Sequence, residues 1–157
     1  MGYDILKNEE QVTVVVTLDA DNQHNPDEVK NIIKPILAGE SQMVIGSRRL
    51  GSADKGSLFR VTGVYLLTWL INFISGTKLT DCSSGFKAFS TVALQKIRLY
   101  EAQYQSTEVI IEAAKQGLII AEVPIHIASR EFGDSKKGTN WQYGYRFLKV
   151  IVKSWWR

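Results

Sequence analysis

The feature that most constrains the fold is a continuous apolar run, residues 12–18, which leads into two aspartates one residue apart. The run reads VTVVVTL, and its β-branched residues favour a strand buried on both faces of a parallel sheet. Ligands of open α/β sheets bind beyond the carboxyl ends of such strands, because the loops there leave backbone and side chains free. Asp19 and Asp21 are therefore predicted to lie at a binding site.

Asp19, Asp21 and Gln23 alternate along the turn that follows this strand. Carboxylate and amide oxygens on one side of a turn suit a hard divalent cation, so the pattern predicts a Mg²⁺ or Mn²⁺ site. Such ions are usually shared with substrate phosphates. The alternative is an aspartate-rich turn in which Asp21 and Asn25 serve only as caps. His24 is interpreted as a loop donor rather than as a ligand.

Strand and helix patterns alternate along the rest of the chain. Strands are predicted at 12–18, 42–46 and 118–123, with 125–127 as an edge extension beyond a proline, and a short strand before residue 91. Helices are predicted at 26–37, 58–75, 91–97, 106–117 and 140–155, and a loop at 50–57. The first strand, helix and strand predict a βαβ unit with a right-handed crossover. The expected fold class is α/β, with a mostly parallel sheet flanked by helices.

Cationic residues lie in two parts of the chain. Arg48 comes directly after the second strand, and Arg60 lies at the start of the apolar helix. A glycine-containing loop later in the chain carries Arg130, Ser135 and Lys136. The planar fork of arginine matches phosphate oxygens, although each cluster alone is equally consistent with ordinary surface charge. Together with the acidic turn, these clusters predict a site for phosphorylated substrates.

Composition excludes several other classes of protein. The 157 residues suffice for one domain with its own core, and the single cysteine, Cys82, excludes an internal disulfide framework. The formal net charge is +3, and residues 130–157 hold seven basic and two acidic side chains. A nucleic-acid partner is not predicted, because this basic segment carries no recognition module and the paired aspartates would go unexplained.

Two apolar segments bear on membrane contact. Residues 58–75 are predicted to form a core or membrane-contacting helix rather than a span, because a span needs about 20 predominantly apolar residues and the charge-free part includes several polar ones. Residues 147–157 mix cations with aromatics, which suits a bilayer interface. The alternative for this segment is an amphipathic helix docked on the sheet. The first residues lack the pattern of a signal peptide.

Five segments, taken in order, carry a resemblance: VVTLDADNQHNPDEV, MVIGSRRLG, TDCSSGFKAFS, GLIIAEVPIHI and SREFGDSKKG. They resemble successive blocks of the family 2 glycosyltransferases, in the dolichyl-phosphate mannose synthase-like branch. Five ordered blocks over nearly the whole chain are more specific than any single one. The resemblance implies a GT-A-like (Rossmann-like) fold and transfer of a sugar from a nucleotide-diphosphate sugar, usually with inversion. The implied acceptor is a polyprenyl-phosphate-type lipid or a glycan.

The resemblance also implies roles for individual residues, carried over by position. The implied metal ligands are Asp19, Asp21 and Gln23, and the implied catalytic residues are Asp21, Arg48 and Arg130. The implied substrate-binding residues are Gln23, Arg48, Arg60, Asp81, Ser84, Gly85, Arg130, Ser135 and Lys136. Glu108 lies where many relatives place an acidic residue, but no general base is assigned, because a phosphate acceptor is already ionised.

The family's domain opens with a strand and an acidic cluster that bind the nucleotide base and ribose. Only eighteen residues precede Asp19, too few for two or three βα units, so residues 1–157 are expected to be the C-terminal part of one catalytic domain. The alternative function is a catalytically inert half-domain that binds metal and phosphate or needs a partner chain. The expected location is the cytoplasm, with peripheral contact at the cytoplasmic face of the membrane.

Overall fold

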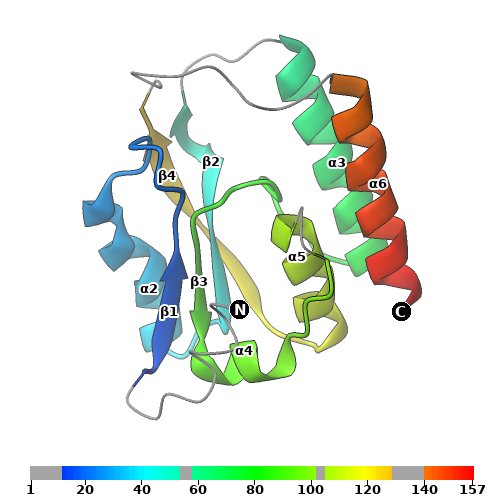
Figure 1. Cartoon of the computed structure of the whole chain (residues 1–157). Helices are drawn as coiled ribbons and strands as arrows, with labels where there is room; N and C mark the ends of the chain where they lie inside the picture. The colour runs from blue at the N-terminus through cyan, green and yellow to red at the C-terminus, as the bar shows by residue number, and fades with distance from the viewer. Residues whose placement is uncertain (1–11, 54–57, 102–104, 129–139) are drawn as a thin grey trace.

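The computed structural model describes residues 12–53, 58–101, 105–128 and 140–157, with side chains in 12–52, 62–101, 105–128 and 147–157 (Figure 1). Its elements are β1 (Val14–Thr17), the 3-10 turn η1 (Pro26–Glu28), α2 (Val29–Leu37), β2 (Met43–Ala53), α3 (Leu58–Ser75), β3 (Lys87–Ser90), α4 (Thr91–Lys96), α5 (Gln105–Lys115), β4 (Ile120–Ile127) and α6 (Asn140–Trp156). All five predicted helices are present, and α3 has the predicted bounds.

The four strands form one mixed sheet in the order β1-β3-β2-β4. Strand β3 is antiparallel to both of its neighbours, whereas β2 and β4 are parallel. Strands β1, β2 and β4 therefore run in one direction, which confirms the predicted mostly parallel α/β arrangement. The predicted βαβ unit is present as β1–α2–β2, but its two strands are separated by β3. The carboxyl end of β1, at Thr17, and the first half of β2, at Ile45, consequently lie on either side of Lys87 at the start of β3.

Two details of the predicted strands are wrong. Strand β1 is an edge strand that pairs with β3 alone among the described residues, in the antiparallel direction. Only Val15 is buried, and Val14 and Val16 on the other face are half-buried, so the strand is not fully buried on both faces. Strand β2 continues through residues 50–53, which were predicted to be loop. A side chain at Gly51 would lie 2.0 Å from the carbonyl oxygen of Ile125. Glycine therefore lets β2 approach β4 closely enough to pair beyond its bulge.

Strand β4 confirms the predicted edge extension after Pro124. The strand runs through the proline to Ile127, and β4 forms the outer edge of the sheet beside β2. Pro124 is exposed, as expected for a residue that cannot donate a ladder hydrogen bond. The predicted helix stops are also present, because Gly39 and Gly117 have φ values of 73° and 65°, in the left-handed region.

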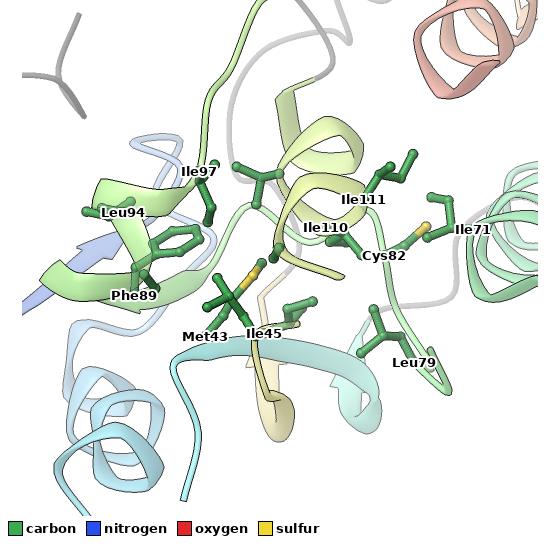
Figure 2. Packing of buried hydrophobic residues seen from close by; sticks show 14 of the residues in the cluster. Met43, Ile45, Ile71, Leu79, Cys82, Phe89, Leu94, Ile97, Ile110 and Ile111 are labelled. Carbon is green, nitrogen blue, oxygen red and sulfur yellow. The ribbon is translucent and has the colours of Figure 1, made fainter. Parts of the chain in front are cut away.

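Helices cover both faces of the sheet (Figure 1). Side chains alternate along β2, so that Met43 and Ile45 join one apolar cluster and Val44 joins the other. In the smaller cluster, α2 packs against one face of the sheet. Its buried residues are Ile32, Val44, Phe86, Ala88 and Ile125. The larger cluster on the other face includes Phe89 of β3, Ile71 of α3 and Ile110 of α5 (Figure 2). Helices α3 and α6 lie side by side beyond α5.

Candidate active site

The acidic turn lies directly beyond β1. Asn22 has a φ of 62°, in the left-handed region that asparagine tolerates better than most residues. The backbone N–H of Gln23 donates to Oδ1 of Asp21 at 3.4 Å, which closes the turn. The side chain of Asp19 is 65% exposed, and Asp21 is also exposed. Both carboxylates are therefore accessible to a ligand from solvent.

The loop before β3 brings Gly85 against this turn. The hydroxyl of Thr17, the last residue of β1, donates to the carbonyl oxygen of Gly85 at 3.2 Å. A methyl group added at Gly85 would lie 2.5 to 2.7 Å from the carboxylate atoms of Asp19, closer than real contacts allow. The missing side chain therefore leaves the space that the Asp19 carboxylate occupies. Two of the predicted blocks, 68 residues apart in sequence, meet at this point.

The end of the acidic turn is fixed to the end of β4. The side-chain amide of Gln23 donates to the carbonyl oxygen of Ala128 at 3.0 Å, and the backbone N–H of Ala128 donates to the carbonyl oxygen of Gln23 at 3.1 Å. His24 forms an antiparallel bridge with Ile127. With its nitrogen on Ala128, the Gln23 amide keeps its oxygen as an acceptor for a cation.

Arg48, which is half-buried, forms an ion pair with the buried carboxylate of Asp81. Its Nε donates to Oδ2 of Asp81 at 2.5 Å and its Nη2 to Oδ1 at 2.7 Å, which is the bidentate geometry. Burial would raise the pKa of Asp81, but the hydrogen bonds and charge of Arg48 outweigh it and hold that pKa below its usual value. The hydrogen bonds to Asp81 also raise the pKa of Arg48, against the effect of burial. Both residues are predicted site residues, and the structure places them in direct contact.

Neighbouring polar groups hold the loop that carries Asp81. The carboxylate of Glu122 in β4 accepts the backbone N–H groups of Thr80 at 2.7 Å and Asp81 at 3.0 Å. The hydroxyls of Ser47 and Thr80 are 2.6 Å apart. Sequence reasoning missed Glu122, although an acidic residue within an apolar strand pattern was a usable signal. These contacts attach the loop before β3 to the middle of β2 and to β4.

Lys87 is a second residue that sequence reasoning missed. It lies at the start of β3, is 3% exposed, and donates through Nζ to the carbonyl oxygen of Ser84. Burial lowers the pKa of its amine to about 8, against the attraction of Asp81. Ser84 is itself buried, and its hydroxyl accepts the backbone N–H of Phe86 at 3.3 Å. Both residues therefore support the floor of the site from within.

Four predicted site residues have no described side chain. Arg60 lies in the first turn of α3, but its side chain is outside the described part of the structure. Arg130, Ser135 and Lys136 fall in residues 129–139, which also lie outside it. Among the other predicted site residues, the structure brings Asp19 against Gly85 and Arg48 against Asp81. Gln23 contacts Ala128 instead, and Ser84 contacts Phe86. The roles of these residues stay predictions.

Residues 7–98 match the model of the family described as glycosyl transferase family 2. The chain belongs to glycosyltransferase family 2. A second comparison finds an uncharacterized protein of Methanocaldococcus jannaschii, 36% identical over 88% of this chain and 59% of that protein. The same comparison finds the UDP-N-acetylglucosamine–dolichyl-phosphate N-acetylglucosaminyltransferase of Methanococcus voltae, which is 33% identical over 88% of this chain and 57% of that protein. This family 2 chain thus spans less than two thirds of the length of these relatives.

A solved structure confirms the GT-A-like fold of this family 2 member. Glucosyl-3-phosphoglycerate synthase from Mycobacterium tuberculosis, in complex with Mn²⁺ and UDP-glucose, superposes with a TM-score of 0.70. The two sequences are 21% identical, and the match covers 98% of this chain and 52% of that one. At this identity the likeness shows the fold alone.

The acidic turn of this family 2 chain offers donors that suit Mg²⁺ or Mn²⁺. Asp19, Asp21 and Gln23 supply oxygen atoms, which these ions prefer, and Gly85 leaves room for the first carboxylate. Within the described residues, no group of three or more His, Cys, Asp or Glu side chains forms a metal cluster. Mg²⁺ usually keeps several waters and shares substrate phosphate oxygens, so one or two carboxylates are a common protein contribution to its site.

Proposed function

We propose that this chain transfers a sugar from a nucleotide-diphosphate sugar to a polyprenyl-phosphate-type lipid, with the help of Mg²⁺ or Mn²⁺. In this reaction an oxygen of the acceptor bonds to the anomeric carbon, and the nucleoside diphosphate leaves. The observation that carries the proposal is the pair of exposed carboxylates, Asp19 and Asp21, beside the Gly85 loop at the carboxyl end of β1. The relative from Methanococcus voltae is named as a dolichyl-phosphate transferase, which supports this acceptor class.

The donor diphosphate is assigned to the acidic turn. Asp19, Asp21 and the amide oxygen of Gln23 would hold the cation, which when bound neutralises the negative charge of the leaving diphosphate. Gln23 is pre-oriented for this role by its hydrogen bond to Ala128. We further propose that Arg48, Arg60, Arg130, Ser135 and Lys136 bind the phosphates of donor or acceptor.

A phosphate acceptor suits the site better than a hydroxyl acceptor, because the carboxylate of Glu108 already accepts backbone hydrogen bonds and is not placed to act as a general base. Glu108 is fully buried, and its carboxylate accepts the backbone N–H groups of Tyr100 and Glu101, both at 3.0 Å. This carboxylate is committed to holding the segment that follows α4. A hydroxyl acceptor would need a general base, whereas an ionised phosphate does not.

A lipid-linked acceptor requires contact with a membrane, and we propose that α3 and α6 provide it. These neighbouring helices expose large apolar side chains: Tyr65, Leu66, Trp69 and Phe73 on α3, and Leu148, Val152, Trp155 and Trp156 on α6. Aromatic residues mixed with cations such as Lys149 and Lys153 suit the bilayer interface. No helix in the described ranges has the length and apolar character needed to cross a membrane. The proposed location is therefore peripheral, at the cytoplasmic face.

The transfer reaction is tested with radiolabelled nucleotide sugars and polyprenyl phosphate in vesicles, with Mn²⁺ present. Asp21→Asn should abolish transfer, since it removes a charged oxygen ligand but preserves the shape of the side chain. The matched control is Asp27→Asn, which changes an exposed carboxylate near the start of α2. Undiminished turnover in Asp21→Asn would refute the metal role. Absence of transfer by the wild-type chain with every donor tried would refute the transfer function.

A second candidate is a unit that binds metal and phosphate but needs a partner chain for transfer. Strand β1 favours this candidate, because among the described residues it has an unpaired edge and mostly half-buried apolar side chains. Calorimetric titration with a nucleotide sugar, with and without Mn²⁺, separates the two. Tight, metal-dependent binding without turnover would favour the second candidate, and binding with turnover would favour the transferase.

A further inference from the structure

His24 is buried beside the acidic turn, although it belongs to a loop. Its side chain is only 3% exposed, and its ring packs edge-on against Phe86 with the ring centroids 5.1 Å apart. The antiparallel bridge to Ile127 fixes its backbone. The ring therefore cannot move without disturbing both the smaller apolar cluster and the end of β4.

The two ring nitrogens of His24 have different surroundings. Nε2 lies 3.9 Å from Oδ2 of Asp19, within electrostatic reach but beyond a direct hydrogen bond. Nδ1 is buried and has no hydrogen-bond partner in the part of the chain that the structure describes. A buried acceptor without a partner is tolerated better than a buried N–H, which assigns the proton to Nε2. This tautomer directs an N–H towards the carboxylate of Asp19.

The carboxylate of Asp19 has two close neighbours. Gly85 lies against it, where a methyl group would not fit, and Nε2 of His24 faces its Oδ2. An apolar side chain at position 24 would pack on Phe86 without leaving an unpaired nitrogen in the interior. The imidazole is therefore better explained by what Nε2 does than by packing alone.

We propose that His24 is a positioning residue, which through Nε2 holds the carboxylate of Asp19 in the direction needed to bind a divalent cation together with Asp21. The inference rests on the metal role of the acidic turn under the proposed function. It assigns His24 no direct contact with the cation. The orientation of Asp19 is set before any substrate arrives, so the effect of His24 should appear in metal affinity as well as in turnover.

Two amide substitutions separate the roles of the ring nitrogens. The amide nitrogen of Gln reaches the place of Nε2, whereas that of Asn reaches only the place of Nδ1. Mn²⁺ affinity, measured from the electron paramagnetic resonance signal of free Mn²⁺, should be nearly preserved in His24→Gln and should fall about 10–100-fold in His24→Asn, as for other residues that orient metal ligands. Equal affinities of the two variants, whether preserved or lost, would overturn the proposal.

A double-mutant cycle tests whether His24 acts through Asp19. In an Asp19→Asn background, His24→Asn should weaken Mn²⁺ binding no further, since the group it positions is gone. A full additional loss would overturn the proposal while leaving the metal site itself intact. No Mn²⁺ binding by the wild-type chain would instead overturn both the metal role and this inference.

A measurement on the wild-type chain avoids any folding defect of the variants. Nitrogen-15 spectra of the His24 imidazole should show the proton on Nε2, and the Nε2 signal should shift when diamagnetic Mg²⁺ is added. A proton on Nδ1, or an unchanged Nε2 signal at saturating Mg²⁺, would overturn the proposal.

Discussion

Two groups of charged residues lie near the start of β3, and they differ in how far their carboxylates are exposed to solvent. We call Arg48, Asp81 and Glu122 the paired cluster, because their charged atoms contact one another or the backbone of the loop before β3. The acidic turn, Asp19 and Asp21, instead exposes its carboxylates to solvent. The difference indicates that the paired cluster shapes the site, whereas the acidic turn is left available for a ligand.

The strongest way to break the paired cluster is Asp81→Asn. Asp81 is 1% exposed and pairs with both donor groups of the Arg48 fork. Removing its charge leaves the guanidinium without a counter-charge, so the free energy of unfolding should fall by about 3–5 kcal/mol. Urea unfolding measures the change. The double variant Arg48→Met/Asp81→Leu should recover most of the loss, and a loss below about 1 kcal/mol in Asp81→Asn would show that the pair is effectively solvated.

The pH dependence of the same pair follows from the lowered pKa of Asp81. The unfolded chain binds the proton at higher pH than the folded chain does. The contribution of Asp81 is therefore complete above its ordinary pKa and is lost as the pH falls through the folded value. As the pH falls below about 4, the stability gap between wild type and Asp81→Asn should begin to narrow, and it should close once the pH is below the folded pKa of Asp81. A gap that stays constant into this acid range would contradict the ion-pair explanation.

Lys87→Met tests the buried cation that adjoins the paired cluster. The folded pKa of Lys87 is about 8, against 10.5 for the free side chain, so burial of the charged amine destabilises the fold below pH 8. Between these values the unfolded chain holds more protons, and the contribution of Lys87 becomes more favourable as the pH rises. Relative to Lys87→Met, the wild type should gain about 3 kcal/mol over this range.

Unfolding in urea at several pH values from 7 to 10 measures this gain. Burial raises the pKa of Cys82 to about 11, which acts in the opposite direction above pH 9, and the charge of Lys87 itself lowers that pKa. The comparison is therefore repeated in a Cys82→Ala background. A pH-independent difference between wild type and Lys87→Met would show that the amine reaches solvent.

Asp21→Asn tests the other half of the comparison. The carboxylate of Asp21 is exposed, so its loss should change the free energy of unfolding by less than about 0.5 kcal/mol. Its loss should nevertheless weaken Mn²⁺ binding by at least about tenfold, since even residues that only orient metal ligands have effects of that size. Calorimetry and urea unfolding on the same samples measure both. If Asp21→Asn lost much stability but kept its Mn²⁺ affinity, Asp21 would have a structural role like that of the paired cluster and would not be a metal ligand.

Local patterns predicted most of the elements but not the way the sheet is assembled. The apolar run of α3 and the proline at the start of η1 are local signals, and both predictions are confirmed. Strand β3 is only four residues long, and nothing in its sequence indicates that it lies antiparallel between β1 and β2. The extension of β2 depends on contact between Gly51 and Ile125, which are far apart in sequence.

The candidate site was predictable in its residue types but not in its internal pairing. Asp19 and Arg48 were both predicted to follow apolar strands. Asp19 does lie beyond the end of β1, whereas Arg48 lies inside β2, which continues to Ala53. That Arg48 is held by Asp81, 33 residues later, depends on the loop before β3 and on Glu122 beneath it. Burial of His24 and Lys87 arises in the same way, from tertiary contacts that no local pattern carries.

The smallest expected effect distinguishes two adjacent arginines. Arg48 lies in the buried pair, whereas Arg49 is exposed and stacks over the ring of Tyr65 at 3.6 Å. The hydroxyl of Ser47 accepts the backbone N–H of Arg49 at 3.3 Å, at the start of the β2 bulge, and this turn sends the two side chains to different partners. Arg49→Ala should lower the free energy of unfolding by no more than about 1 kcal/mol, which is typical of an exposed cation–π contact. Arg48→Ala is the matched comparison and should cost several times as much, because it leaves a buried carboxylate unpaired. Equal losses in urea unfolding would mean that the bulge, rather than the ion pair, sets the stability of this edge.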